Sequence, residues 1–272
     1  MQVGIFAKTF AGTDPLGVLG AVRDSGYAAT QFNLACCGLP SMPDAVPDAT
    51  VAATRAASKA TGISLVALSG TYNMAHPDIS VRQTGFRQLA VVIRTAAELA
   101  IPLVTLCTGT RHASDQWAHH PDNADPSAWA DMAEEMSKAL ALAEEHGVNL
   151  GIEPEQANIV TSAADARRLI EEMGSKRLRI VLDPANLFES ATPAEARIIV
   201  AQAVDTAAGH IAMAHAKDRH ADGRFATAGT GVVDFRDFIA RLTSTGFDGP
   251  LVTHGLSVAE APDVAAFLKG LL

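Results

Sequence analysis

The sequence is poor in cysteine and contains no long apolar run. Its 272 residues include three cysteines, Cys36, Cys37 and Cys107. The adjacent pair has the spacing of neither a zinc knuckle nor a redox CxxC motif, so we expect reduced thiols in the core or in loops. No apolar stretch approaches the roughly 18 residues of a membrane span, and the amino-terminal segment lacks the features of a signal peptide. The sequence therefore predicts a cytoplasmic protein without a membrane partner.

Positive charge is also scarce in this chain. Lys and Arg total 21 residues against 30 Asp and Glu, which gives a formal net charge of -9 at pH 7. Proteins that hold a nucleic-acid backbone do so through a positive field made by Lys and Arg. We therefore expect no nucleic-acid partner.

The sequence does contain eight short strand-like runs that are rich in Val, Ile and Leu and do not alternate cleanly with polar residues. Such runs are typical of parallel strands covered on both faces. Longer helical stretches separate them, and no low-complexity linker interrupts the alternation. The chain length of 272 residues is close to the roughly 250 residues of one eightfold barrel. We predict an α/β fold, a single (β/α)8 TIM barrel that occupies residues 1–272 as one domain, with strands near residues 3–9, 28–34, 63–69, 101–107, 148–153, 178–183, 210–215 and 250–254.

The sequence also marks where several helices begin and end. Asp125 can cap a helix whose first turn contains Pro126, and the run TPAE at residues 192–195 combines a capping box with proline at the first helical position. Two loops, after the second and fourth predicted strands, are longer than a barrel needs, which is typical of loops that carry binding. Five glycines stand where helices should stop before the next strand, namely Gly62, Gly147, Gly174, Gly209 and Gly246.

Each of the last four strand-like runs ends on an ionisable side chain. The runs VNLGIE, LRIVLD, HIAMAH and PLVTH end at Glu153, Asp183, His215 and His254. The C-terminal ends of barrel strands surround one mouth, so we expect these four side chains to converge. Two carboxylates and two imidazoles form a mixed oxygen and nitrogen set suited to Mn, Co, Zn, Fe or Mg. The sequence therefore predicts one divalent metal ion at this mouth.

The most specific motifs are IEP at 152–154, LDPAN at 182–186, HAKD at 215–218 with GTG at 229–231, and GFDGPLVTHGL at 246–256. In these motifs the chain resembles the sugar phosphate isomerase/epimerase family of xylose isomerase-like TIM barrels, which includes ketose 3-epimerases, hydroxypyruvate isomerases and inosose dehydratases. The resemblance spans nearly the whole chain and implies that Glu153, Asp183 and His215 bind the metal. The fourth ligand of that family is a Glu, and His254 stands at its position here.

The departure at His254 bears on the chemistry, because the resemblance implies that the last Glu of the family is also one of two acid/base groups beside the substrate. A metal can accept His in place of Glu, but a coordinated imidazole is no free base. Either His254 binds the metal while another residue moves the proton, or the second proton step differs from that of the ketose epimerases. His254 is therefore a candidate both as a ligand and as a catalytic group.

The resemblance also implies two substrate contacts. In the epimerases a His three residues after the sixth-strand Asp touches the substrate, and Asn186 takes that place here with both a donor and an acceptor. The family has an Arg a few residues after the seventh-strand His, and Arg219 could fill that place. Asn186 in place of His implies a changed substrate.

Other polar residues near the predicted strand ends are further candidates. Glu155 could contact a sugar hydroxyl or act as the second carboxylate that His254 does not supply. Lys217 and Asp218 could orient the substrate or support a metal ligand, since a ligating His usually needs a partner on its other ring nitrogen. Arg111 lies in the long fourth loop, which could cover a polar substrate.

We expect a divalent-metal-dependent isomerase or epimerase that acts on a small polyhydroxylated carbonyl compound by proton transfer through an enediolate. Glu153 is the candidate base for the first proton. The same enediolate can expel a leaving group, so a lyase acting on a keto-sugar or keto-cyclitol is an alternative. A third hypothesis is a sugar-binding barrel without catalysis. The sequence leaves open the sugar, the metal and whether the chain forms a homo-oligomer.

Overall fold

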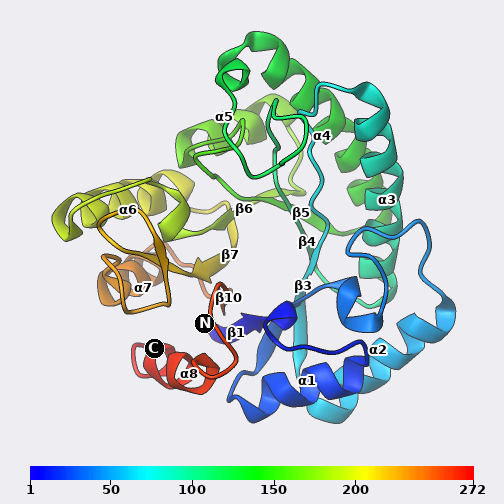
Figure 1. The fold of residues 1–272 in the computed structure, drawn as a ribbon, viewed down its shortest axis with the longest axis vertical. Helices are drawn as coiled ribbons and strands as arrows, with labels where there is room; N and C mark the ends of the chain where they lie inside the picture. The colour runs from blue at the N-terminus through cyan, green and yellow to red at the C-terminus, as the bar shows by residue number, and fades with distance from the viewer.

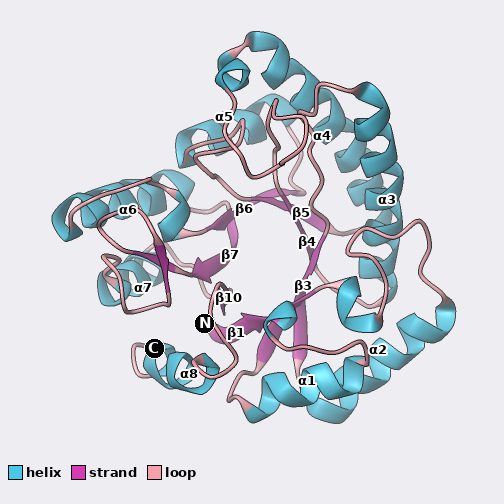
Figure 2. Cartoon of the chain, viewed as in Figure 1, coloured by secondary structure: helices cyan, strands magenta, loops and turns pink.

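Eight parallel strands form a closed barrel at the centre of the protein (Figure 1 and Figure 2). The computed structural model describes all residues from Met1 to Leu272. Around the barrel the strands follow chain order, and the last strand pairs with the first, with Gln2 opposite Pro250. The predicted TIM barrel is confirmed. The barrel strands are β1 Gln2–Phe6, β2 Ala29–Phe32, β3 Ser64–Ser69, β4 Leu103–Leu106, β5 Asn149–Ile152, β6 Leu178–Leu182, β7 Ile211–Ala216 and β10 Pro250–Thr253.

Helices form an outer ring around this barrel (Figure 2). No helix is both long enough and apolar enough to cross a membrane. The α-helices are α1 Pro15–Asp24, α2 Asp48–Thr61, α3 Ile79–Glu98, α4 Pro126–His146, α5 Ala163–Met173, α6 Pro193–Ala207, α7 Phe235–Ser244 and α8 Ala261–Lys269. The short 3-10 helices are η1 Ala7–Thr9, η2 Leu34–Cys37, η3 Pro121–Ala124 and η4 Pro184–Asn186.

The helix boundaries follow the signals in the sequence. Asp125 directly precedes the first residue of α4, Pro126, and its carboxylate accepts a hydrogen bond from the Ser127 backbone N–H. At the start of α6 both halves of the predicted capping box are present, between Thr192 and Glu195. Of the five predicted glycines, Gly62, Gly147 and Gly174 are left-handed C-caps, and the other two follow one residue after the caps of α6 and α7. Local capping therefore fixes where these helices meet the strands.

The inside of the barrel changes from apolar to polar along the strands. Ala67, Leu103, Val181, Met213 and Val252 form a buried cluster apart from the main core. Gly151 lies in the same layer, since a Cβ there would stand 2.7 Å from Val181 Cγ2. Because side chains on a strand alternate between its two faces, the residues two positions further along also point inward. These are Ser69, Thr105, Glu153, Asp183, His215 and His254.

A two-stranded antiparallel hairpin lies between β7 and α7, formed by β8 Asp218–Arg219 and β9 Phe225–Ala226. The sequence analysis did not predict it, because strands of two residues carry no periodic signal. The Phe225 ring is 54% exposed, and the Lys217 ammonium and the Arg219 guanidinium each lie 4.2 Å from its centroid. The hairpin thus brings an aromatic side chain to the edge of the mouth.

Candidate metal centre

Glu153, Asp183, His215 and His254 meet at the mouth of the barrel. One nitrogen or oxygen atom from each side chain can be chosen so that all four atoms lie within 4.8 Å of one another. Glu153 and Asp183 directly follow β5 and β6, His215 lies within β7, and His254 directly follows β10. The structure brings together the four side chains that the sequence singled out. Their role as metal ligands stays a prediction.

Asp183 is the centre of this cluster. Its side chain is fully buried, and its Oδ2 accepts hydrogen bonds from His254 Nε2 at 3.0 Å and lies 3.2 Å from Lys217 Nζ. Burial alone would raise the pKa of the Asp183 carboxyl, but the Lys217 charge and the hydrogen bond from His254 outweigh it and hold this pKa well below its usual range. Asp183 is therefore a carboxylate at neutral pH, with its negative charge directed at the other ligand-type groups.

Glu153 is held by neighbours on one oxygen atom. Asn186 Nδ2 donates to Glu153 Oε1 at 2.6 Å, and His215 Nδ1 lies 3.4 Å from the same oxygen. Burial raises the pKa of Glu153, but the nearby His215 lowers it by more, so the net shift is downward. The second oxygen, Oε2, makes no hydrogen bond within the protein. Glu153 therefore keeps one carboxylate oxygen available to a ligand.

Gln31, which the sequence analysis missed, fixes the orientation of His215. The Gln31 amide donates from Nε2 to Ser69 Oγ at 3.1 Å and to Thr105 Oγ1 at 3.2 Å. Its Oε1 accepts a hydrogen bond from His215 Nε2 at 2.9 Å. The other ring nitrogen, Nδ1, then faces Glu153 and Asp183, at 3.4 and 3.7 Å from their nearest oxygens. The one available signal was a glutamine inside the apolar run of β2.

His254 packs against His215, with the two ring centroids 4.5 Å apart. Its Nε2 points at Asp183 and its side chain is 24% exposed. Burial and the adjacent His215 lower the pKa of His254, although the bond to Asp183 opposes them. His254 is therefore a neutral imidazole turned into the cluster.

A cavity of about 540 Å³ opens above the cluster at the mouth of the barrel. Glu155 and Asn186 line it, together with three of the four clustered residues and with Lys217. Lys217 Nζ also donates to Asn186 Oδ1 at 2.7 Å, so both polar ends of the Asn186 amide are engaged. Burial, followed by the charge of Glu153, raises the pKa of Glu155 to about 7. Of the five predicted substrate contacts, Glu155 and Asn186 thus reach the cavity.

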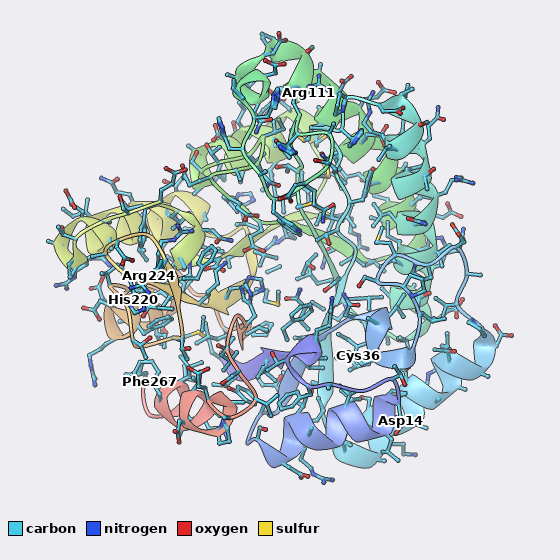
Figure 3. The ribbon with its side chains drawn as sticks, viewed as in Figure 1. Asp14, Cys36, Arg111, His220, Arg224 and Phe267 are labelled. Carbon is cyan, nitrogen blue, oxygen red and sulfur yellow. The ribbon has the colours of Figure 1, made fainter.

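The other three predicted substrate contacts do not line this cavity. Arg111 lies in the upper part of the view in Figure 3, and its guanidinium is 2.7 Å from the Asp131 carboxylate of α4. Arg219 donates to the backbone carbonyls of Ala185, Glu189 and Gly223. These two guanidinium groups hold loops in place.

Asp218 is completely buried beside the hairpin. Its carboxylate accepts hydrogen bonds from the backbone N–H groups of Arg219, Gly229, Gly231 and Val233. A Cβ at Gly231 would collide with this carboxylate and with the backbone of Arg219, which explains the second glycine of the GTG motif. Asp218 therefore organises the loop after β7 and has no free oxygen to offer a substrate.

Two comparisons with known proteins bear on the family of the chain. A family model described as xylose isomerase-like TIM barrel matches residues 19–270. No curated protein sequence matches the chain.

Solved structures of sugar epimerases share the fold over almost their whole length. The 3-keto-D-glucoside 4-epimerase from E. coli superposes with a TM-score of 0.77 at 19% identity, covering 99% of both chains. D-psicose 3-epimerase from Clostridium cellulolyticum H10 gives a TM-score of 0.77 at 15% identity, covering 100% of this chain and 99% of the other. L-ribulose 3-epimerase gives 0.77 at 20% identity, covering 99% and 95%. At these identities the likeness establishes the fold alone.

Proposed function

The chain belongs to the xylose isomerase-like TIM barrel family, and from this premise we propose that it is a divalent-metal-dependent isomerase or epimerase of a small polyhydroxylated carbonyl compound. One observation carries the proposal: four ligand-type side chains from four strand ends lie within 4.8 Å of one another. The structural neighbours named above are by name epimerases of a 3-keto-D-glucoside, D-psicose and L-ribulose, which supports a sugar substrate.

The donor set fits a divalent cation. Carboxylate and imidazole ligands stand about 2.0 to 2.2 Å from a bound ion such as zinc, so any two of them are at most about 4.4 Å apart. The observed spread of 4.8 Å needs only a small contraction. Glu153, Asp183, His215 and His254 would hold the ion, with His215 directing Nδ1 and His254 directing Nε2. When bound, the ion would stabilise negative charge that develops on the carbonyl oxygen of the substrate.

Glu153 is the residue that we assign to take the first proton. Its Oε1 accepts a hydrogen bond from Asn186 and lies 3.4 Å from His215 Nδ1, so this oxygen would bind the ion, whereas Oε2 makes no hydrogen bond within the protein and belongs to a cavity-lining side chain. A carboxylate oxygen in this place can remove a proton from the carbon beside the carbonyl, which leaves an enediolate. Lys217 and Asn186 keep the carboxylate in position through their mutual hydrogen bond.

Glu155 is the residue that we assign to return the proton. His254 Nε2 points at Asp183, so we do not assign His254 as a free base. Glu155 lines the same cavity as Glu153, and its side chain makes no hydrogen bond within the protein. The proton would reach a different face of the same carbon in an epimerase, or the neighbouring carbon in an isomerase.

The test of this proposal measures metal content and solvent exchange together. Purified protein should carry about one divalent ion per chain, and His254→Glu should keep it, because a carboxylate can also ligate. In heavy water, a panel of ketoses, keto-acids and keto-cyclitols should give a product of unchanged formula with deuterium at the reacting carbon. Release of water or another leaving group would identify a lyase instead. Metal-loaded enzyme that is inert across the panel would favour a sugar-binding protein.

A further inference from the structure

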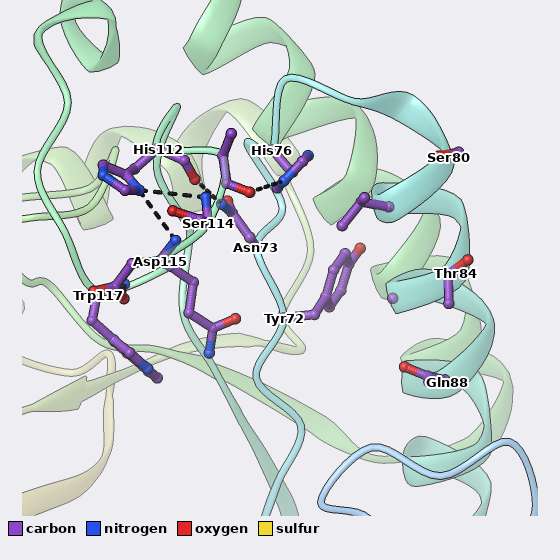
Figure 4. A pocket seen from close by; sticks show the side chains of 14 residues that line it. Tyr72, Asn73, His76, Ser80, Thr84, Gln88, His112, Ser114, Asp115 and Trp117 are labelled. Carbon is purple, nitrogen blue, oxygen red and sulfur yellow. Dashed lines mark hydrogen bonds between the residues drawn. The ribbon is translucent and has the colours of Figure 1, made fainter.

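A second cavity adjoins the mouth of the barrel, in the groove between α3 and the loop after β4. Its volume is about 640 Å³, within the roughly 300 to 1,000 Å³ of ligand pockets. Figure 4 shows it with Tyr72 on one side, the α3 residues Ser80, Thr84 and Gln88 on another, and the 112–117 loop opposite. The proposed metal centre makes no use of this groove.

Gln116 and Trp117 line both this groove and the cavity above the metal centre. The two spaces are therefore neighbours that share this pair of side chains. Trp117 is 49% exposed, and the Gln116 amide makes no hydrogen bond within the protein. An aromatic face and an unpaired amide at the junction suit a ligand that continues from one space into the other.

The lining of the groove selects a class of ligand. It contains no Lys or Arg, so it offers nothing to balance a phosphate or a carboxylate. Only four of its 14 residues are hydrophobic, which does not suit an acyl chain. Hydroxyl, amide and imidazole groups around two aromatic rings match a neutral sugar, which has many hydroxyls and an apolar ring face.

Hydrogen bonds fix the shape of the groove without a ligand. The Asn73 amide donates to Thr110 O at 2.8 Å and accepts from Thr110 N at 2.9 Å. His76 Nε2 donates to Ala113 O at 2.9 Å, and His112 Nδ1 accepts from the backbone of Asp115 at 3.1 Å (Figure 4). These bonds hold the loop after β4 against the loop after β3, so the groove is preformed.

The floor of the groove is formed by Tyr72, which packs closely against α3. The Tyr72 hydroxyl donates to the buried Glu135 at 3.0 Å. The ring packs directly on Gly85 of α3, where any Cβ would collide with it. Glycine inside a helix is less favourable than alanine, so the close approach of ring and helix comes with a local penalty.

From these observations we propose that the groove is a glycosyl subsite, and that the substrate is a carbonyl sugar carrying a second neutral sugar unit. This inference rests on the proposed function for the unit at the metal centre. The reacting unit occupies the cavity with Glu153 and Glu155, the linkage passes Trp117, and the second unit lies between Thr84 and Gln116.

The test is a binding experiment that needs no turnover. We would titrate the protein with D-glucose, maltose and cellobiose by isothermal calorimetry, with saturation-transfer NMR to identify the ring protons in contact. The preferred disaccharide should bind at least about tenfold more tightly than glucose, which corresponds to about 1.4 kcal/mol. Both of its rings should receive saturation. Disaccharides that bind no better than glucose, or show no saturable binding, would overturn the proposal.

A blocking variant locates the binding. Thr84→Trp fills the groove, and Thr84 does not line the mouth cavity. Its matched control is Gln83→Trp, one residue away on the exposed face of α3 and outside the groove. Thr84→Trp should reduce the disaccharide preference to less than about twofold, and Gln83→Trp should preserve it. An unchanged preference in Thr84→Trp, at unchanged thermal stability, would refute the subsite.

Two more measurements distinguish failure of the glycosyl subsite from failure of the proposed function. Asp183→Ala should lose metal and yet keep the contact of the second ring with the groove, because Thr84 and Gln116 lie outside the metal cluster. If the proposed function fails while this contact persists, the groove stands as a sugar site. If Thr84→Trp changes the mass by light scattering and leaves sugar binding unchanged, the groove is a contact between copies and the subsite is wrong.

Discussion

The two halves of the barrel mouth carry different chemistry. On the half built by β5, β6, β7 and β10, each strand ends on an ionisable side chain, and these four meet in one cluster. On the half that contains β2, β3 and β4, the inward residues are Gln31, Ser69 and Thr105, which are neutral, and the Gln31 amide donates to both hydroxyls. The two halves are linked by the hydrogen bond that His215 Nε2 donates to Gln31 Oε1. One half therefore supplies the ionisable groups, and the other fixes the orientation of His215.

Of the substitutions below, Asp183→Ala should have the largest effect on the ionisable half of the mouth. Asp183→Ala removes the acceptor for His254 and Lys217, and it leaves the buried Lys217 charge without its carboxylate partner. We expect bound metal to fall from about one ion per chain to none and activity to fall below detection. Metal analysis by mass spectrometry checks this result, with the exposed Asp205→Ala as the matched control. Full metal content in Asp183→Ala would rule out the site.

Glu153→Gln tests the ionisable half with a smaller change. The amide preserves the shape but cannot take a proton, so we expect the turnover number to fall by about 10² to 10⁴. Metal affinity should weaken, because a neutral amide is a poorer ligand than a carboxylate. Steady-state kinetics at saturating metal separates the two effects, and Glu98→Gln on the exposed end of α3 is the control. An active Glu153→Gln enzyme would remove Glu153 from the mechanism.

Gln31→Leu tests whether the neutral half orients the ionisable one. Leucine has a similar size but leaves His215 Nε2 without its acceptor. Loss of such an outer partner typically weakens metal binding by about 10- to 100-fold. Gln31→Glu restores an acceptor oxygen and should recover most of the affinity, as measured by competition with a fluorescent chelator. Equal affinity in wild type and Gln31→Leu would make the Gln31 contact a packing feature only.

Asp218→Asn should have the smallest effect on chemistry. The Asp218 carboxylate serves four backbone N–H groups and no cavity. Replacing one oxygen by an NH₂ donor should destabilise the fold by about 1 to 3 kcal/mol with little change in KM. Denaturant unfolding and kinetics at a temperature where both proteins are folded test this together. A large rise in KM at unchanged stability would indicate that Asp218 contacts the substrate after all.

The sequence predicted the elements whose signals are local. Eight apolar runs became eight barrel strands, and the strand-end residues converged because a barrel gathers the ends of all its strands. Arg111 and Arg219 do not line the mouth cavity, because sequence proximity to a strand end does not tell where a long side chain finds acceptors. The Arg111 guanidinium pairs with Asp131 of α4, and the Arg219 guanidinium donates to backbone carbonyls such as that of Ala185 in η4.

Gln31 was overlooked for a related reason. Its partner His215 is 184 residues away in the chain, so the sequence around Gln31 gives no indication of the contact. The groove beside α3 was equally hidden, because it depends on how the loops after β3 and β4 are tied together. Long-range pairing of single polar side chains leaves no period in the sequence.

The pairing of β1 with β10 also governs when the cluster can form. Gln2 opposes Pro250, so the barrel closes only after the last strand has docked beside the first. His254 follows that strand directly, and it is the last of the four clustered residues to reach its place. Closing the barrel and completing the cluster are therefore the same event in folding.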